Sequence, residues 1–336
     1  MSIIINALKI VFLLGFLIFI HEGGHFLAAR LSKVKVEEFS IGFGPKLFKK
    51  KGKETEYSLS LFPFGGYVRM TGENERSEDP NSFNNAKILN RIFIVAAGAI
   101  VNIIFGIIVY FILSMSSGYN ISTTVSKILP EAEQNISSVE IGDKILKIDD
   151  TNIRLKSDIT KALENYIPGN EVSILLERNG EEISAKAKPT EYQENFYILG
   201  VEVALIQGSL KDKIYYSFWE TIDFVSSIGD SLVMLFTGNI GIEQMTGPVG
   251  ISEIVVKSDG IYNFVYLLCL VSLSLGVTNL LPIPALDGGR LVLLVIEGIR
   301  GKALKEEIEL GIQSVGFTLL ILFALYVTYN DILRIF

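Results

Sequence analysis

Cysteine is almost absent from this sequence, and so is histidine: the 336 residues include one cysteine and two histidines. The single Cys269 lies in an apolar run, so the chain can form no internal disulfide. A concentrated basic arm is also missing, and the net charge is −7. Both features argue against a nucleic-acid partner.

The N-terminal segment lacks the marks of a cleaved signal peptide. Only Lys9 stands for the basic region of such a peptide, and no clear small-residue cleavage site precedes His21. We therefore expect a retained transmembrane helix.

The chain is rich in apolar residues. Hydrophobic residues make up 49% of it and mean hydropathy is +0.41, yet 20% of the residues are charged. This composition predicts an integral membrane protein with one soluble domain. A spanning helix needs about 20 mostly apolar residues, and four stretches qualify: 4–29, 92–115, 263–283 and 312–329. Residues 291–299 are too few to span and are expected to continue the third helix after a break.

Basic residues are concentrated in two connections between these stretches. The first runs from Arg30 to Arg91, and the second, before the last stretch, contains Arg290, Arg300, Lys302 and Lys305. Positively charged connections face the cytoplasm, whereas the long acidic segment between the second and third helices should lie outside. Both chain termini then face outward.

The two histidines belong to the sequence His21-Glu22-Gly23-Gly24-His25, inside the first apolar stretch. Positions i and i+4 share one face of a helix, so both imidazoles can reach one metal ion, and Glu22 beside them suits a general base. The alternative is that the two histidines are core residues that form hydrogen bonds and bind no metal. Ionisable groups inside a bilayer cost roughly 2.5–3.5 kcal/mol each on insertion scales, and this cost favours the metal site.

A second polar motif, Asn279 to Arg290, ends the third apolar helix. Pro282 and Pro284 must interrupt that helix, and the charge-based orientation brings Asp287 to the same leaflet as the histidines. Two imidazoles and one carboxylate suit tetrahedral zinc, with water in the open fourth position. Alternatively, Asp287 is a helix-end carboxylate satisfied by local amides.

The first cytoplasmic connection predicts a β-hairpin at about 54–70. Polar and apolar residues alternate over 54–61, residues 63–66 suggest a turn, and 67–70 resume an extended pattern. We expect this hairpin at the membrane surface, although an ordinary soluble hairpin is the alternative. In the second helix, the lone polar Asn102 predicts either an interhelical hydrogen bond or a role near the reaction centre.

Together, His21–His25, Phe64–Met70 and Asn279–Gly289 resemble the bacterial site-2 proteases, an intramembrane zinc metalloprotease family, of the regulator of sigma-E protease type. Gly42–Pro45 and Gly247–Gly250 extend the resemblance, which covers nearly the whole chain. It implies Zn2+ bound by His21, His25 and Asp287, with Glu22 as the catalytic base. Expected substrate contacts are Gly65, Gly66, Tyr67, Val68, Asn102, Asn279 and Pro282.

The expected fold is a polytopic α-helical membrane protein with four transmembrane helices, a cytoplasmic-side membrane-associated β-hairpin and one extracytoplasmic PDZ-like α+β domain. Residues 1–118 and 263–336 would form the two halves of the protease core. Residues 119–204 would form the PDZ-like domain, and 205–262 an extracytoplasmic amphipathic helix followed by a Gly-rich loop.

The resemblance implies a multi-pass protein of the bacterial inner membrane whose active site lies near the cytoplasmic side of the lipid bilayer. Its substrates would be single-span membrane proteins, such as anti-sigma factors or remnant signal peptides, trimmed first by an upstream site-1 protease. Two other functions stay open at this point. One is zinc transport or sensing without hydrolysis, and the other is a catalytically silent scaffold.

Overall fold

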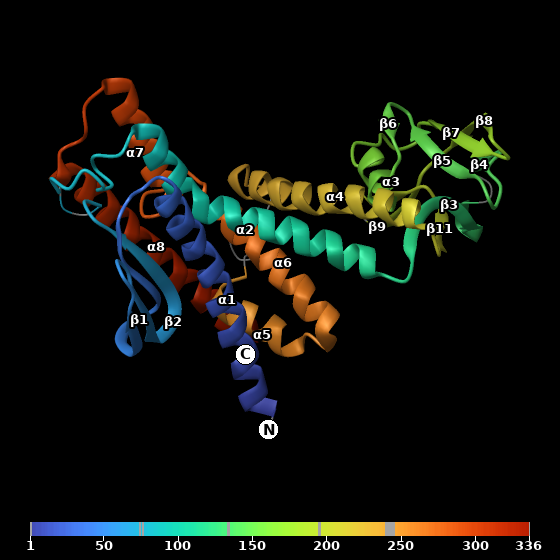
Figure 1. Cartoon of the computed structure of the whole chain (residues 1–336). Coiled ribbons are helices and arrows are strands. Elements are labelled where there is room, and N and C mark those ends of the chain that lie inside the picture. Colours follow the sequence, from blue (N-terminus) through green and yellow to red (C-terminus); the bar gives the residue numbers. More distant parts are fainter. Residues whose placement is uncertain are drawn as a thin grey trace. The chain divides into compact units, whose positions relative to one another are not determined.

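The computed structural model describes residues 2–335 apart from 74, 76, 133–134, 194–195 and 239–245. Two compact units divide the chain, one made of Met1–Tyr110 with Ile228–Phe336 and the other of Phe111–Ser227 (Figure 1). Each unit has its own buried apolar core.

Among the described residues, four helices are long and apolar enough to cross a membrane: α1 (Ser2–Leu31), α2 (Ile88–Ser116), α6 (Gly260–Asn279) and α8 (Glu306–Ile335). Large apolar side chains such as Phe12, Ile108 and Leu322 remain exposed along them, as expected where lipid replaces water. The prediction of a polytopic helical membrane protein is confirmed. The third helix ends at Asn279 and not at residue 283, because Pro282 lacks a backbone N–H and disfavours helical backbone in the preceding residue.

The hairpin between the first two long helices differs from the predicted one. Its strands are β1 (Val36–Lys51) and β2 (Glu56–Met70), and residues 63–66, predicted as the turn, lie within β2. The chain reverses within each of these strands: segments 38–41 and 46–51 of β1 run in opposite directions, and Gly42 and Gly44, with φ of +87° and +86°, lie between them. Segment 56–59 pairs with 38–41 in the same direction, and 66–69 pairs with it in the opposite direction, so the chain reverses between residues 59 and 66, where the turn was predicted. The two arms lie on either side of 38–41 and do not pair with each other.

The pairing register makes residues 66–70 an outer edge of this sheet. Glu38 lies opposite both Arg69 and Glu56, and Ile41 lies opposite both Gly66 and Leu59. The segment 38–41 is thus the middle of the sheet, with the two ends of β2 on either side of it.

A buried carboxylate holds the sheet together. The Glu38 side chain, 2% exposed, contacts Lys46 Nζ at 2.5 Å and Arg69 Nη2 at 3.1 Å. It also accepts hydrogen bonds from Tyr67 Oη at 2.8 Å and Ser58 Oγ at 2.9 Å. Burial opposes ionisation, but the hydrogen bonds from Lys46, Tyr67 and Ser58 outweigh it and hold the pKa of Glu38 below its ordinary value.

A short helix, α7 (Asp287–Arg300), follows α6 after the break at 280–286. Its buried Leu294 joins one core cluster with Ala28 of α1, Val68 of β2 and Val95 of α2. This cluster packs α1, the hairpin, α2 and α7 together around the histidine motif.

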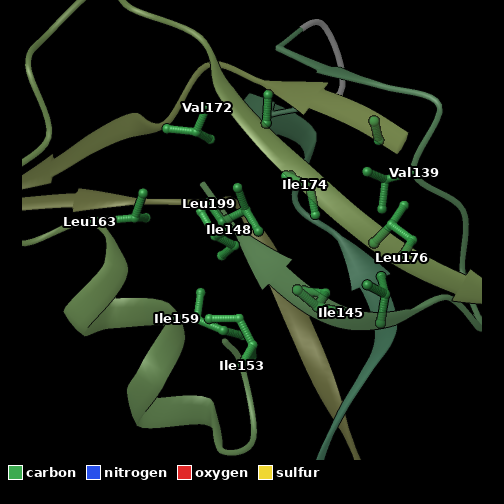
Figure 2. Close-up of a cluster of buried hydrophobic side chains, with 13 residues drawn as sticks. Val139, Ile145, Ile148, Ile153, Ile159, Leu163, Val172, Ile174, Leu176 and Leu199 are labelled. Carbon is green, nitrogen blue, oxygen red and sulfur yellow. The ribbon is translucent and has the colours of Figure 1, made fainter. Parts of the chain in front are cut away.

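The second unit is an α+β structure built on a largely antiparallel sheet. The strand order is β11 (Val201–Ile206), β3 (Asn120–Ile128), β5 (Lys144–Ile148), β7 (Val172–Arg178), β8 (Glu181–Ala187), β4 (Ile136–Ser137), with β6 (Thr151–Asn152) pairing β5. Helix α3 (Lys156–Ala162) covers the sheet through Ile159, which lies near Ile145 and Ile148 (Figure 2). Strands β9 (Thr190–Gln193) and β10 (Phe196–Ile198) form a separate pair.

Along the chain, two more helices follow the sheet strands and precede α6. Helix α4 (Leu210–Phe236) is the predicted amphipathic helix, and α5 (Pro248–Lys257) begins inside the predicted Gly-rich loop. Gly247 is its N-cap and Pro248 its first residue, a position that proline suits. The prediction of a loop was therefore wrong for residues 248–250, while residues 239–245 of that segment lie outside the described residues.

Candidate metal centre

Three side chains from two distant parts of the chain meet at one point. His21 and His25 lie one turn apart on α1, with their Nε2 atoms 3.3 Å from each other. Oδ2 of Asp287, the first residue of α7, lies 3.3 Å from His21 Nε2 and 3.5 Å from His25 Nε2. Donors about 2.0–2.1 Å from a tetrahedral zinc ion are separated by roughly 3.3–3.4 Å. The triangle therefore has the size that a zinc ion requires.

The other ring nitrogen of each histidine faces a partner of its own. His25 Nδ1 lies 2.9 Å from the carbonyl oxygen of Ile94, to which only a protonated Nδ1 can donate. His21 Nδ1 lies 3.3 Å from the side-chain amide of Asn102. That amide is buried and its Oδ1 has no hydrogen-bond partner in the described structure, so rotating the amide would let Oδ1 accept from Nδ1–H. Such partners leave both Nε2 atoms free for a metal.

The Asp287 carboxylate supplies a further test of the fit. Its Oδ2 is buried, and the described residues offer it no hydrogen-bond partner. A buried acceptor without a donor is destabilising, and a cation between this oxygen and the two imidazoles would satisfy it. These three residues form the metal-binding group that the described part of the chain contains, and they fit Zn2+.

Close backbone contact between α1 and α2 sets the position of His25. A Cβ added to Gly24 would lie 2.6 Å from the Ala97 carbonyl oxygen, and one added to Gly98 would lie 2.7 Å from Cδ2 of His25. Any larger residue at either position would push the helices apart. Ile94 and Gly98 were not among the predicted site residues, because a backbone carbonyl and a missing side chain leave no chemical signal in a sequence.

A tight turn holds Asp287. A Cβ on Gly289 would lie 2.8 Å from Pro284 Cα, so this glycine lets α7 start directly against the preceding turn. Ala285 has φ of +73°, and its N–H donates to Gln313 Oε1 of α8 at 2.6 Å. The turn is thus anchored by α8 as well as by its own glycines.

A cavity of about 190 Å³ opens on the three metal-binding side chains. Glu22 and the outer edge of the sheet lie in its wall; the lining residues are His21, Glu22, His25, Gly66, Tyr67, Val68, Met70, Glu73, Val95, Asp287 and Arg290. Gly66 is necessary here, since a Cβ on it would lie 2.9 Å from Glu22 Cγ.

The predicted substrate contacts divide into two groups. Gly66, Tyr67 and Val68 line this cavity, whereas Gly65, Asn279 and Pro282 are outside its described lining. Asn102 faces His21 and not the cavity. Glu73 and Arg290 line the cavity but were not predicted, since each is an ordinary charged residue in its local sequence.

The profile of Peptidase family M50 matches residues 9–323. The chain belongs to peptidase family M50. The zinc metalloprotease RasP of Shouchella clausii is 30% identical over 98% of this chain and 99% of its own. A relative in Clostridium acetobutylicum is 35% identical over 97% of both chains. The regulator of sigma-W protease RasP of Bacillus subtilis is 27% identical over 98% of this chain and 99% of its own.

The predicted membership of the site-2 protease family is confirmed by these matches. This M50 protein is a zinc metalloprotease with membrane-spanning helices, as expected from its His21, His25 and Asp287 group. Membership of this family disfavours the two alternative functions, which were zinc transport or sensing without hydrolysis and a catalytically silent scaffold.

Proposed function

We propose that this M50 protease hydrolyses a peptide bond in or near the transmembrane segment of single-span membrane proteins. The observation that carries the proposal is the shared cavity, in which the three metal-binding side chains, the Glu22 carboxylate and an open strand edge come together among membrane-spanning helices. Anti-sigma factors and remnant signal peptides are substrates of this kind. The name of the Bacillus subtilis relative, a regulator of sigma-W protease, supports the first class.

His21, His25 and Asp287 would hold the zinc ion. When bound, zinc acidifies a water molecule and polarises the scissile carbonyl. Glu22 follows His21 directly and lines the same cavity, so its carboxylate can take the proton from that water and later give it to the leaving amine. Asn102 and the Ile94 carbonyl would orient the two imidazoles.

The outer edge of the sheet would bind the substrate backbone. Thr71 N–H donates to Lys35 O at 3.0 Å, on the side of β1. Because backbone groups alternate in direction along a strand, those of Gly66, Val68 and Met70 point away from β1. These residues line the cavity. A transmembrane helix that unwinds locally could add there as a further strand, which would present its carbonyls to the metal centre.

The proposed setting is the bacterial inner membrane, with the active site near the cytoplasmic side. The basic connections at Arg30–Arg91 and Arg290–Lys305 support this orientation. The sheet unit would then be extracytoplasmic, as would both termini. We propose a PDZ-like role for this unit as a size filter that admits substrates already cut by a site-1 protease.

The test uses the purified full-length protein and single-span substrates, with products mapped by mass. Glu22→Gln should abolish cleavage while zinc content and thermal unfolding stay those of wild type, because the amide cannot accept the proton. A chelator should stop the wild-type reaction, and added zinc should restore it. Continued proteolysis by the Glu22→Gln variant would refute the assigned base.

A further inference from the structure

Glu73 joins the end of the substrate edge to the helix that carries a metal-binding residue. One carboxylate oxygen, Oε2, accepts a hydrogen bond from the backbone N–H of Met70 at 3.2 Å. The other, Oε1, accepts from Arg290 Nη1 at 2.6 Å. Arg290 lies on α7, three residues after Asp287. The Glu73 side chain is 9% exposed, so the contacts are shielded from solvent.

The N–H that Glu73 occupies belongs to the free edge of the sheet. Thr71 donates toward β1, so Met70 donates in the opposite direction, as do Val68 and Gly66. An added strand would need these outward groups. At Met70 the carboxylate already takes the donor, which leaves Val68 and Gly66 for a substrate.

We propose that Glu73 sets the register of the substrate on this edge and thereby selects the bond that is cut. The inference rests on the proposed strand addition. The carboxylate ends the usable edge after Val68, and its ion pair with Arg290 keeps that end at a constant distance from Asp287. A strand can slide only in steps of two residues if its side chains are to keep their faces. Removing the stop would therefore admit a second register, two residues away.

Glu73→Ala tests this inference by the position of the cut. The variant frees the Met70 N–H, so we expect a second product whose terminus is shifted by two residues. The ratio of shifted to original product should rise about fivefold, the factor expected for one hydrogen bond of average strength. Products from a single-span substrate are mapped by mass, and zinc content is measured on the same samples.

Three further variants separate the register from other effects. Glu73→Gln keeps an oxygen that can accept from Met70, and Arg290→Met leaves Glu73 in place without its ion pair. Both should cut at the original bond, even if more slowly. Glu37→Ala is the matched control, because it removes a carboxylate bonded to Thr71 Oγ1 and not to the Met70 N–H. A single unshifted product from Glu73→Ala, or equal shifts in all four variants, would overturn the proposal.

A cross-linking experiment tests the register of the substrate without requiring proteolytic activity. In the Glu22→Gln background, Arg69→Cys, at an edge position whose side chain is 52% exposed, is oxidised with substrates that carry one cysteine at successive positions. The native Cys269 is buried and does not interfere. The parent should link one substrate position, and adding Glu73→Ala should create a second link two residues away. No link in the parent would refute strand addition itself. A single, unchanged link would refute only the role of Glu73.

Discussion

At the scale of single residues, the metal centre depends on atoms that carry no charge. His25 is oriented by the Ile94 carbonyl on one side and lies against the backbone of Gly98 on the other. The imidazole thus occupies a slot between α1 and α2 that leaves its Nε2 directed toward Asp287. The groups around the ligands therefore affect the affinity of the site for zinc, just as the ligands determine which metal it binds.

Gly98→Ala should weaken zinc binding. The added methyl group would overlap the imidazole of His25, and disturbing the surroundings of a ligand typically reduces metal affinity by about 10–100-fold. Competition with a fluorescent chelator measures this affinity in the purified protein. Gly15→Ala is the control, since a Cβ there meets nothing within 4 Å. Wild-type affinity in Gly98→Ala would contradict the account of the slot.

The ligands themselves were predictable from the sequence, and their supports were not. Histidines at i and i+4 share a helix face wherever they occur, so His21 and His25 could be paired without a structure. The slot needed the packing of α2 on α1, to which Ile94 contributes a backbone oxygen and Gly98 only the lack of a side chain. Every apolar helix has backbone oxygens, and many contain glycines, so the sequence alone does not mark these two residues as part of the slot.

At the scale of elements, long-range contacts decide where structure begins and ends. The buried carboxylate of Asp331 on α8 accepts hydrogen bonds from Gly250 N at 2.8 Å and Gly247 N at 3.2 Å. These donors lie at the start of α5, where helical N–H groups lack partners within the helix. The sequence around residue 247 therefore suggested a loop, whereas a residue more than eighty positions later caps a helix there.

Asp331→Ala should destabilise α5. The substitution leaves two buried N–H groups without an acceptor, which costs about 1–3 kcal/mol where the side chain is 0% exposed. Hydrogen exchange of residues 247–257 should rise accordingly in the full-length protein. Glu253→Ala, which removes an exposed pair with Lys257 on the same helix, should leave exchange nearly unchanged. Equal protection in Asp331→Ala and wild type would refute the cap.

The turn before β5 contains a buried ion pair that depends on pH. Asp143, 1% exposed, contacts Arg178 Nε of β7 at 2.6 Å and accepts from Glu140 N at 2.8 Å. The hydrogen bonds from Arg178 hold the pKa of Asp143 below its ordinary value. A carboxyl with a lowered pKa stabilises the folded state above its unfolded pKa, and that stability is lost as pH falls through the folded pKa.

We therefore expect the sheet unit to keep its stability from neutral pH down to about pH 4 and to lose it below. Hydrogen exchange of residues 140–148 and 172–178 in the full-length protein, followed against pH, measures this loss. Asp143→Asn should be less protected at pH 7 and should show a smaller further loss on acidification. If wild type and Asp143→Asn lose the same amount of protection on acidification, groups other than Asp143 cause the loss.

At the scale of the whole molecule, the order of the spans and the charge of their connections already predict that the two parts of the site meet. Counting spans and basic connections placed Asp287 in the same leaflet as the histidines, and the structure joins them at 3.3–3.5 Å. The hairpin could not be predicted as well. Its middle segment, residues 38–41, pairs with both ends of β2, and such a register follows from bends at glycines and not from alternation of polar and apolar residues.

The central claim is that α1 and α7 hold one zinc ion between them. Its most direct measurement is the metal content of the purified full-length protein, compared with His25→Ala and Asp287→Ala variants that remain folded by thermal unfolding. We predict one zinc ion per wild-type chain and its loss from both variants, since each removes one of the three protein donors that meet in the described part of the chain. Zinc retained in the Asp287→Ala variant, or a wild-type protein that takes up none, would contradict the account.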